Sequence, residues 1–202
     1  MHFDTIALHE TMFHSSFDHM KEFKLQIAGI IMLLAIMFSS CQPSADKYFG
    51  TAALNCNTFS NFGSNELKLF LMSPPQTYDF EKKAMKTSTF QEYFKFQCID
   101  NAVEGYNKVK DLPITDETRK MITASLALYD YCIPRYQQEY LAIAKMKDDN
   151  KPQAEIETAL QKFDNTYSQQ FLVKYNAAWD EGMIYAKAHD IKVSTVNTRP
   201  SF

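Results

Sequence analysis

Apolar side chains recur at steps of three and four residues along the second half of this chain, the spacing that places them on one face of a helix. The first such stretch runs over 79–111 and is followed by Leu112-Pro113, where a proline disfavours continued helix. Its stripe consists of Phe96, Ile99, Val103 and Tyr106. We therefore expect a first long helix over about 79–111.

A second helix is expected after Thr115, a residue type suited to an N-cap, because Asp116 and Glu117 follow where the helix dipole favours negative charge. Its apolar stripe alternates steps of four and three: Ile122, Leu126, Tyr129, Ile133, Tyr136, Tyr140 and Ile143. Pro134 lies inside this stripe and removes one backbone hydrogen bond, which predicts a kink near 130–134.

The third helix is expected from Pro152, a good first-turn residue, to about His189. Its stripe keeps the same steps as far as Tyr167 and then needs one extra four-residue step, which resembles a stutter. Before the first long helix, 46–57 and 66–72 are helix-compatible, and Ser73-Pro74-Pro75 stops any helix. Residues 191–202 are expected to be extended.

The short loops between these helices favour antiparallel neighbours. Five glycines and seven prolines in 202 residues argue against a turn-dense β architecture. We therefore predict an all-α domain over 46–202, an antiparallel helical bundle of three long helices completed by short N-terminal helices.

A different pattern precedes this domain. Lys21 and Lys24 stand just before an uncharged apolar run over 25–38, and Ser39-Ser40-Cys41 follows it. The run is too short to cross a membrane comfortably, since a spanning helix needs about 20 apolar residues. The segment resembles the type II signal peptides of bacterial lipoproteins, with Phe38-Ser39-Ser40-Cys41 in the place of their lipobox. The alternative is a buried helix that ends in a core cysteine.

The resemblance implies a signal peptide over 20–40, cleavage before Cys41, a lipid on the Cys41 thiol and a tether over 41–45. The tether lacks the acidic run of some surface-exported lipoproteins, which favours the periplasmic face of the outer membrane. Residues 1–19 hold His2, His9, His14 and His19. They are interpreted as an over-extended start, and a histidine metal cluster is the alternative.

Charge and composition exclude several chemistries. Residues beyond Cys41 carry 19 basic and 20 acidic side chains, so we expect no nucleic-acid partner. His189 is the only histidine there, and no catalytic triad, zinc motif or glycine-rich phosphate loop accompanies it. The adjacent pairs Asp148-Asp149 and Asp180-Glu181 are interpreted as solvated. We expect no metal, no cofactor and no enzymatic activity.

Two sets of residues are candidate sites. Cys98 and Cys132 fall at similar heights on the first two helices, so they form either a disulfide or two buried thiols. A group of aromatic residues with one arginine is either a binding groove near the Pro134 kink or the core of the bundle. Its members are Tyr129, Arg135, Tyr136, Tyr140 and Trp179.

The leading functional hypothesis is a membrane-anchored envelope lipoprotein whose helical domain binds a protein partner, as an assembly accessory, an inhibitor or an immunity-type protector. The alternative is a small-molecule binder that uses the aromatic helices. The third hypothesis is an envelope hydrolase that works through carboxylates, a site type that leaves weak marks in a sequence.

Overall fold

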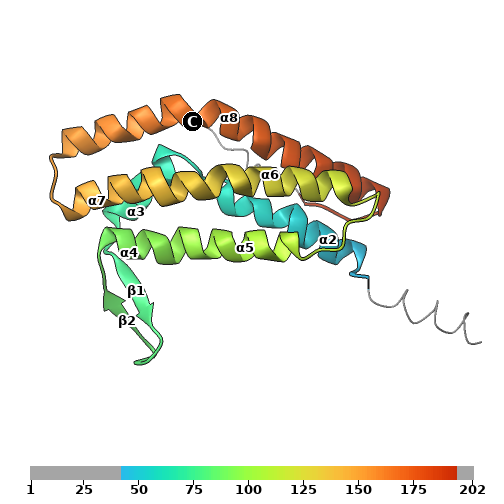
Figure 1. Ribbon diagram of the computed structural model, residues 1–202, viewed down its shortest axis with the longest axis horizontal. Coiled ribbons are helices and arrows are strands. Elements are labelled where there is room, and N and C mark those ends of the chain that lie inside the picture. The colour runs from blue at the N-terminus through green and yellow to red at the C-terminus, as the bar shows by residue number, and fades with distance from the viewer. Residues whose placement is uncertain (1–41, 195–202) are drawn as a thin grey trace, which may run out of the picture. The chain divides into compact units, whose positions relative to one another are not determined.

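The computed structural model describes residues 42–194, and those from Pro43 onward form one compact unit. The fold is mainly helical, as expected (Figure 1). Helix α2 (Ala45–Ala52) begins at Ser44, whose side chain accepts a hydrogen bond from Lys47 N. A 3₁₀ turn (Leu54–Phe59) and helix α3 (Ser64–Met72) follow. The two predicted short helical segments are thus present, and the turn that separates them ends at Gly63.

The prediction of a long first helix over 79–111 is wrong for residues 79–89. Strands β1 (Gln76–Asp79) and β2 (Ala84–Thr87) pair antiparallel, with Tyr78 opposite Met85. The Asp79 carboxylate accepts hydrogen bonds from Glu81 N and Lys82 N, and Lys83 adopts φ 50°. A side chain that bonds the backbone two residues ahead favours a turn over a helix, so a hairpin replaces the helix start.

Helix α4 (Phe90–Phe94) begins instead at Thr89. Thr89 and Glu92 form a reciprocal capping box, which satisfies two of the free amides at the helix start. A second cap comes from a distant part of the chain: Asp148 accepts hydrogen bonds from Phe90 N at 2.7 Å and Gln91 N at 3.1 Å. Asp148 was expected to be merely solvated; its carboxylate fixes the position of α4.

Two π-helical turns interrupt the long helical stretches without a gap in the chain. The first stretch comprises α4, the π turn Lys95–Ile99 and α5 (Asp100–Lys110); the second comprises α6 (Arg119–Arg135), the π turn Tyr136–Tyr140 and α7 (Leu141–Asp148). Such turns insert one extra residue and are frequent at functional sites. Pro134, where a kink was predicted, lies just before the second π turn.

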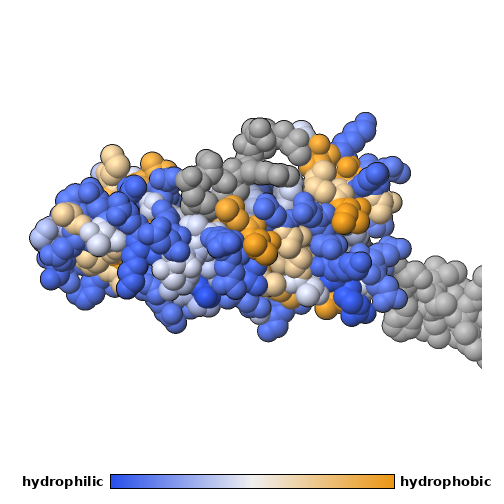
Figure 2. Space-filling view, turned by 90° about the horizontal axis from the view of Figure 1, so that it is seen from above, coloured by the Kyte–Doolittle hydropathy of each residue, from blue (hydrophilic) through white to orange (hydrophobic). Residues whose placement is uncertain are grey.

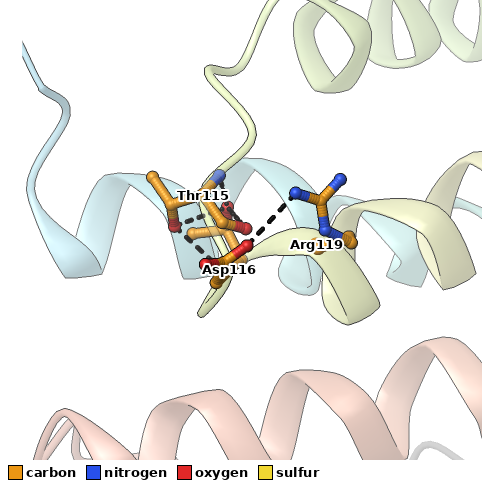
Figure 3. A network of polar contacts seen from close by, with 4 residues as sticks. Thr115, Asp116 and Arg119 are labelled. Atoms are coloured by element: carbon orange, nitrogen blue, oxygen red, sulfur yellow. Dashed lines mark hydrogen bonds and ion pairs between the residues drawn. The ribbon is translucent and has the colours of Figure 1, made fainter.

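Helix α6 starts later than predicted. Thr115 and Thr118 hydrogen-bond each other's backbone amides, and Arg119 pairs with Asp116 at 3.2 Å. Figure 3 shows this network at the start of α6. It closes a separate turn before the helix, so regular helix begins at Arg119 and not directly after Thr115.

Helix α8 (Gln153–Ala188) agrees closely with the predicted third helix. It packs along α6, and α5 lies on the other side of α6 in Figure 1. Gly182 lets α8 approach the N-terminal segment closely, since a Cβ there would lie 2.5 Å from Ala53 Cβ. The core is rich in aromatic rings, with Phe62 stacked on Phe171 at 4.6 Å and on Tyr140 at 5.7 Å.

The surface over α8, seen from above in Figure 2, is mostly hydrophilic with separate hydrophobic patches. Val173 and Ile184 are exposed on this helix. Within residues 42–194, no helix combines the length and the apolar character that crossing a membrane requires.

Candidate functional site

The tyrosines predicted for a groove lie inside the protein. Tyr129 and Tyr140 are 0% exposed and Tyr136 is 2% exposed. Tyr129 packs edge-on against Phe59, and Tyr136 contacts Phe62 and Phe94. These three side chains therefore belong to the core of the bundle, which was the alternative to a binding groove.

The other two residues of the predicted groove, Arg135 and Trp179, lie nearer the surface. The Arg135 guanidinium sits 4.1 Å from the centre of the Tyr131 ring and 5.6 Å from that of Tyr167, and it donates a hydrogen bond to Tyr131 O. This cation–π clamp ties α6 to α8. Trp179 is partly exposed on α8.

Three cysteines of the described region are buried free thiols: Cys56, Cys98 and Cys132. The structure thus shows the alternative to the Cys98–Cys132 disulfide. Burial raises the pKa of Cys56 to about 11, so its thiol stays protonated and unreactive at neutral pH. Cys41, the predicted lipidation site, lies outside the described residues.

The most unusual polar group of the interior is Glu66, on the first turn of α3. Its side chain is 9% exposed, and Oε2 lies 2.9 Å from the Tyr136 hydroxyl and 3.3 Å from the Tyr140 hydroxyl. Burial in this apolar surrounding raises the pKa of Glu66 to about 7, an effect that the two tyrosine hydrogen bonds reduce in part. No cationic side chain forms an ion pair with it within residues 42–194.

The geometry around Tyr140 favours a protonated Glu66. The Tyr140 hydroxyl accepts a hydrogen bond from Gly63 N at 2.6 Å and donates one to Gly63 O at 2.9 Å. A phenol has one proton to donate, so the longer contact to Glu66 becomes a full hydrogen bond when the carboxyl group carries a proton. Glu66, Tyr136 and Tyr140 form what we call the Glu66 network, which links α3 to the second π turn.

The Glu66 network is enclosed by packed side chains, with Phe62 and Phe94 against its tyrosine rings. Glu66 is 9% exposed, so its carboxyl group lies within the packed interior. We therefore interpret the network as a buried structural element, in which the second π turn places Tyr136 and Tyr140 around one carboxyl group.

An open cleft of about 240 Å³ lies between the start of α6 and the end of α8. His189 Nε2 is 3.6 Å from Glu117 Oε2, and its ring lies 4.2 Å from that of Tyr185. The turn that carries Glu117 is fixed by the threonine pair described above (Figure 3). The cleft lining is Glu117, Lys120, Met121, Glu181, Ile184, Tyr185, Ala188 and His189.

This cleft brings together polar residues that the sequence left unconnected. Among residues 42–194, no group of three or more potential ligands is placed to hold a metal ion. The cleft lining combines the charged side chains of Glu117, Lys120 and Glu181 with apolar ones such as Ile184.

The hairpin carries large apolar side chains that are exposed to solvent. Thr77 is 8% exposed, and Tyr78 and Met85, which pair across the strands, lie on the opposite face of the sheet. Met85 is 52% exposed and Tyr78 is half-buried. Phe80 continues this face, with its ring 5.1 Å from that of Tyr78, and is 74% exposed. We call Tyr78, Phe80 and Met85 the hairpin apolar face.

Sequence reasoning missed both the hairpin and Glu66. The hairpin segment includes good helix formers over 81–86, and two contrary signals were Asp79 two residues before Glu81 and the capping-box pair Thr89 and Glu92. Glu66 occupies the first turn of a short helix, where an acidic residue is ordinary and gives no sign of burial.

Comparison of the chain with protein-family models, with curated proteins and with solved structures found no match.

Proposed function

We propose that this chain is a lipid-anchored protein of the cell envelope whose helical domain binds a protein partner through the hairpin apolar face. The observation that carries the proposal is the exposure of Phe80 and Met85, 74% and 52%, beside the half-buried Tyr78 on one face of the hairpin. Large apolar side chains held in water favour a partner that covers them.

Exposed apolar residues concentrate in the part of the sequence that forms α3 and the hairpin. Eight large hydrophobic residues are exposed within 42–194, and four of them fall in the 17 residues from Leu69 to Met85. Leu69 and Met72 are 64% and 84% exposed on α3, the helix that leads into the hairpin. Scattered exposed residues need no explanation, whereas this concentration is typical of an interaction surface.

The position of the hairpin suits an anchored protein. Helix α2 starts at one end of the helical domain and the hairpin projects from the other (Figure 1). A lipid on Cys41 would be separated from α2 by three residues, 42–44, and would hold that end at the membrane. The hairpin would then be free to meet a partner away from the lipid surface. Within this proposal, the stretches α4–α5, α6–α7 and α8 act as three antiparallel helices of a bundle.

The anchor has a direct test. Mass spectrometry of membrane fractions is expected to find a diacylglyceryl group on Cys41, and Cys41→Ala is expected to move the protein to the soluble fraction. A Cys41→Ala protein that stays with membranes after salt washing would refute the anchor.

The interaction surface is tested by comparing two double variants of the full chain in cells. Phe80→Ala with Met85→Ala removes the hairpin apolar face, and Ile114→Ala with Val173→Ala removes equally exposed side chains elsewhere. After chemical cross-linking, we expect a protein adduct of the wild type and of the control that decreases at least tenfold in the hairpin variant. Equal adducts in both variants would refute the proposed surface.

A second candidate is small-molecule binding in the cleft between α6 and α8, which the position of His189 beside Glu117 and Tyr185 favours. Nuclear magnetic resonance screening of small polar ligands tests it. Binders should shift the His189 resonances and lose affinity in Glu117→Gln; the absence of any such binder would exclude the candidate.

A further inference from the structure

We propose that the partner of the hairpin is an acidic, extended protein segment that pairs with the open edge of β2. This inference rests on the proposed function and specifies the chemistry of the partner. It rests on three properties of residues 79–87. These are a net positive charge, an unpaired edge of β2, and lysines that would repel those of a second copy of the hairpin.

The charge on the hairpin is mainly positive and unpaired. Lys82, Lys83 and Lys86 are exposed, and none of them forms an ion pair within the described part of the chain. The Asp79 carboxylate is engaged by the backbone amides of Glu81 and Lys82. Glu81 remains as the one carboxylate of the hairpin free to face a partner. The hairpin thus carries three cations and two anions, and only one of the anions, Glu81, is free of backbone hydrogen bonds. A net positive charge beside an apolar face complements a partner that carries carboxylates and apolar side chains.

The backbone offers a second means of recognition. The sheet consists of β1 and β2 alone in residues 42–194, and every residue of β2 is exposed. One edge of β2 pairs with β1, so the backbone groups of the other edge face water. An extended peptide can satisfy these groups by adding a strand, with alternate side chains in contact with each face. A lipid surface cannot supply that pattern of donors and acceptors, which favours a peptide over a membrane.

The same lysines argue against pairing of the hairpin with a second copy of itself. Lysine on an edge strand opposes self-association, because two copies bring like charges together. Carboxylates on a foreign strand remove that repulsion. The hairpin therefore combines an open edge with a charge selection for acidic strands.

Photo-cross-linking in cells tests the proposal with the full chain. A benzoylphenylalanine is placed at position 80, and at position 173 as the exposed control. We expect adducts at 80 whose partner peptides are acidic. Adducts with neutral or basic peptides would overturn the inference and leave the proposed function intact. Adducts with lipid, or no more protein adduct at 80 than at 173, would overturn both.

A defined probe tests the mode of binding on the purified protein. The probe is a ten-residue peptide alternating Asp and Val, compared with one alternating Lys and Val. We expect the acidic peptide to bind at least tenfold more tightly. It should also slow amide hydrogen exchange in residues 84–87. Lys82→Glu with Lys86→Glu should reverse the preference, while Lys151→Glu with Lys162→Glu, on exposed lysines elsewhere, should preserve it. Equal binding of the two peptides, or binding without protection of β2, would overturn the inference.

Discussion

The Tyr136 hydroxyl donates a 2.9 Å hydrogen bond to Glu66 Oε2, across 70 residues of sequence and in the interior of the protein. The bond joins the first turn of α3 to the second π turn. Burial raises the pKa of this carboxyl group to about 7, more than the tyrosine hydrogen bonds lower it, so folding depends on pH near neutrality.

The first prediction concerns that sensitivity. The ordinary pKa of glutamate is 4.5, and the folded protein holds the Glu66 proton up to about pH 7. Between these values the native state binds more protons than the unfolded chain, so the stability from this group is complete below pH 4.5 and is lost as pH rises to 7. The loss is on the order of 3 kcal/mol, since one pKa unit corresponds to about 1.4 kcal/mol.

Glu66→Gln should remove this loss, because the amide cannot ionise. We expect the variant to be more stable than the wild type at pH 8 and to approach it at pH 5. Urea unfolding from pH 4.5 to 8 measures the difference, in which the other titrating groups cancel. A constant difference across this range would contradict a titrating Glu66.

The second prediction separates the two tyrosines. Tyr140→Phe leaves the N–H group of Gly63 without its acceptor and leaves its C=O group only the 3.4 Å contact from Leu67 N, whereas Tyr136→Phe removes one bond to Glu66. Unpaired buried polar groups destabilise by about 1–3 kcal/mol each. Urea unfolding at pH 5 should therefore show the larger loss for Tyr140→Phe, and the reverse order would show that Gly63 finds other partners.

The third prediction uses adjacent aspartates. Asp148→Ala should reduce the free energy of unfolding by about 1–2 kcal/mol, the range for a lost helix cap, because two amides of α4 lose their acceptor. Asp149→Ala breaks an exposed ion pair with Lys145 and should change stability by a few tenths of a kcal/mol. Thermal unfolding of both variants compares them, and equal effects would deny the capping role.

The fourth prediction concerns two helical glycines. Gly182→Ala places a Cβ against Ala53, and the overpacking, about 1–3 kcal/mol, should exceed the gain in helix propensity of about 1 kcal/mol. Gly50→Ala meets no atom within 4 Å and should stabilise by up to about 1 kcal/mol. Denaturant unfolding should shift in opposite directions, and a stabilised Gly182→Ala would show that α8 and α2 can separate without loss.

Signals between residues close in sequence predicted the helices well where no contact from a distant part of the chain changed the outcome. The stripe after Pro152 gave α8 within a residue or two at each end, because an amphipathic pattern and a proline at the first turn act through neighbours in sequence. The short helices before Pro74 were found for the same reason. The aromatic stripe of the second helix was equally visible, and its members proved to be core.

Contacts between distant residues decided the rest. Residues 79–89 contain helix-forming types, and a hairpin forms there because Asp79 closes a turn. Asp148, about 60 residues later, caps α4 and so helps to fix where the helix begins. The pKa of Glu66 is raised because the folded chain buries its carboxyl group against the second π turn, which supplies Tyr136 and Tyr140. The sequence by itself determined the helical periodicity, since that depends on near neighbours. Only the tertiary structure decided which polar groups are buried and which apolar face remains exposed, because burial depends on what packs from elsewhere in the chain.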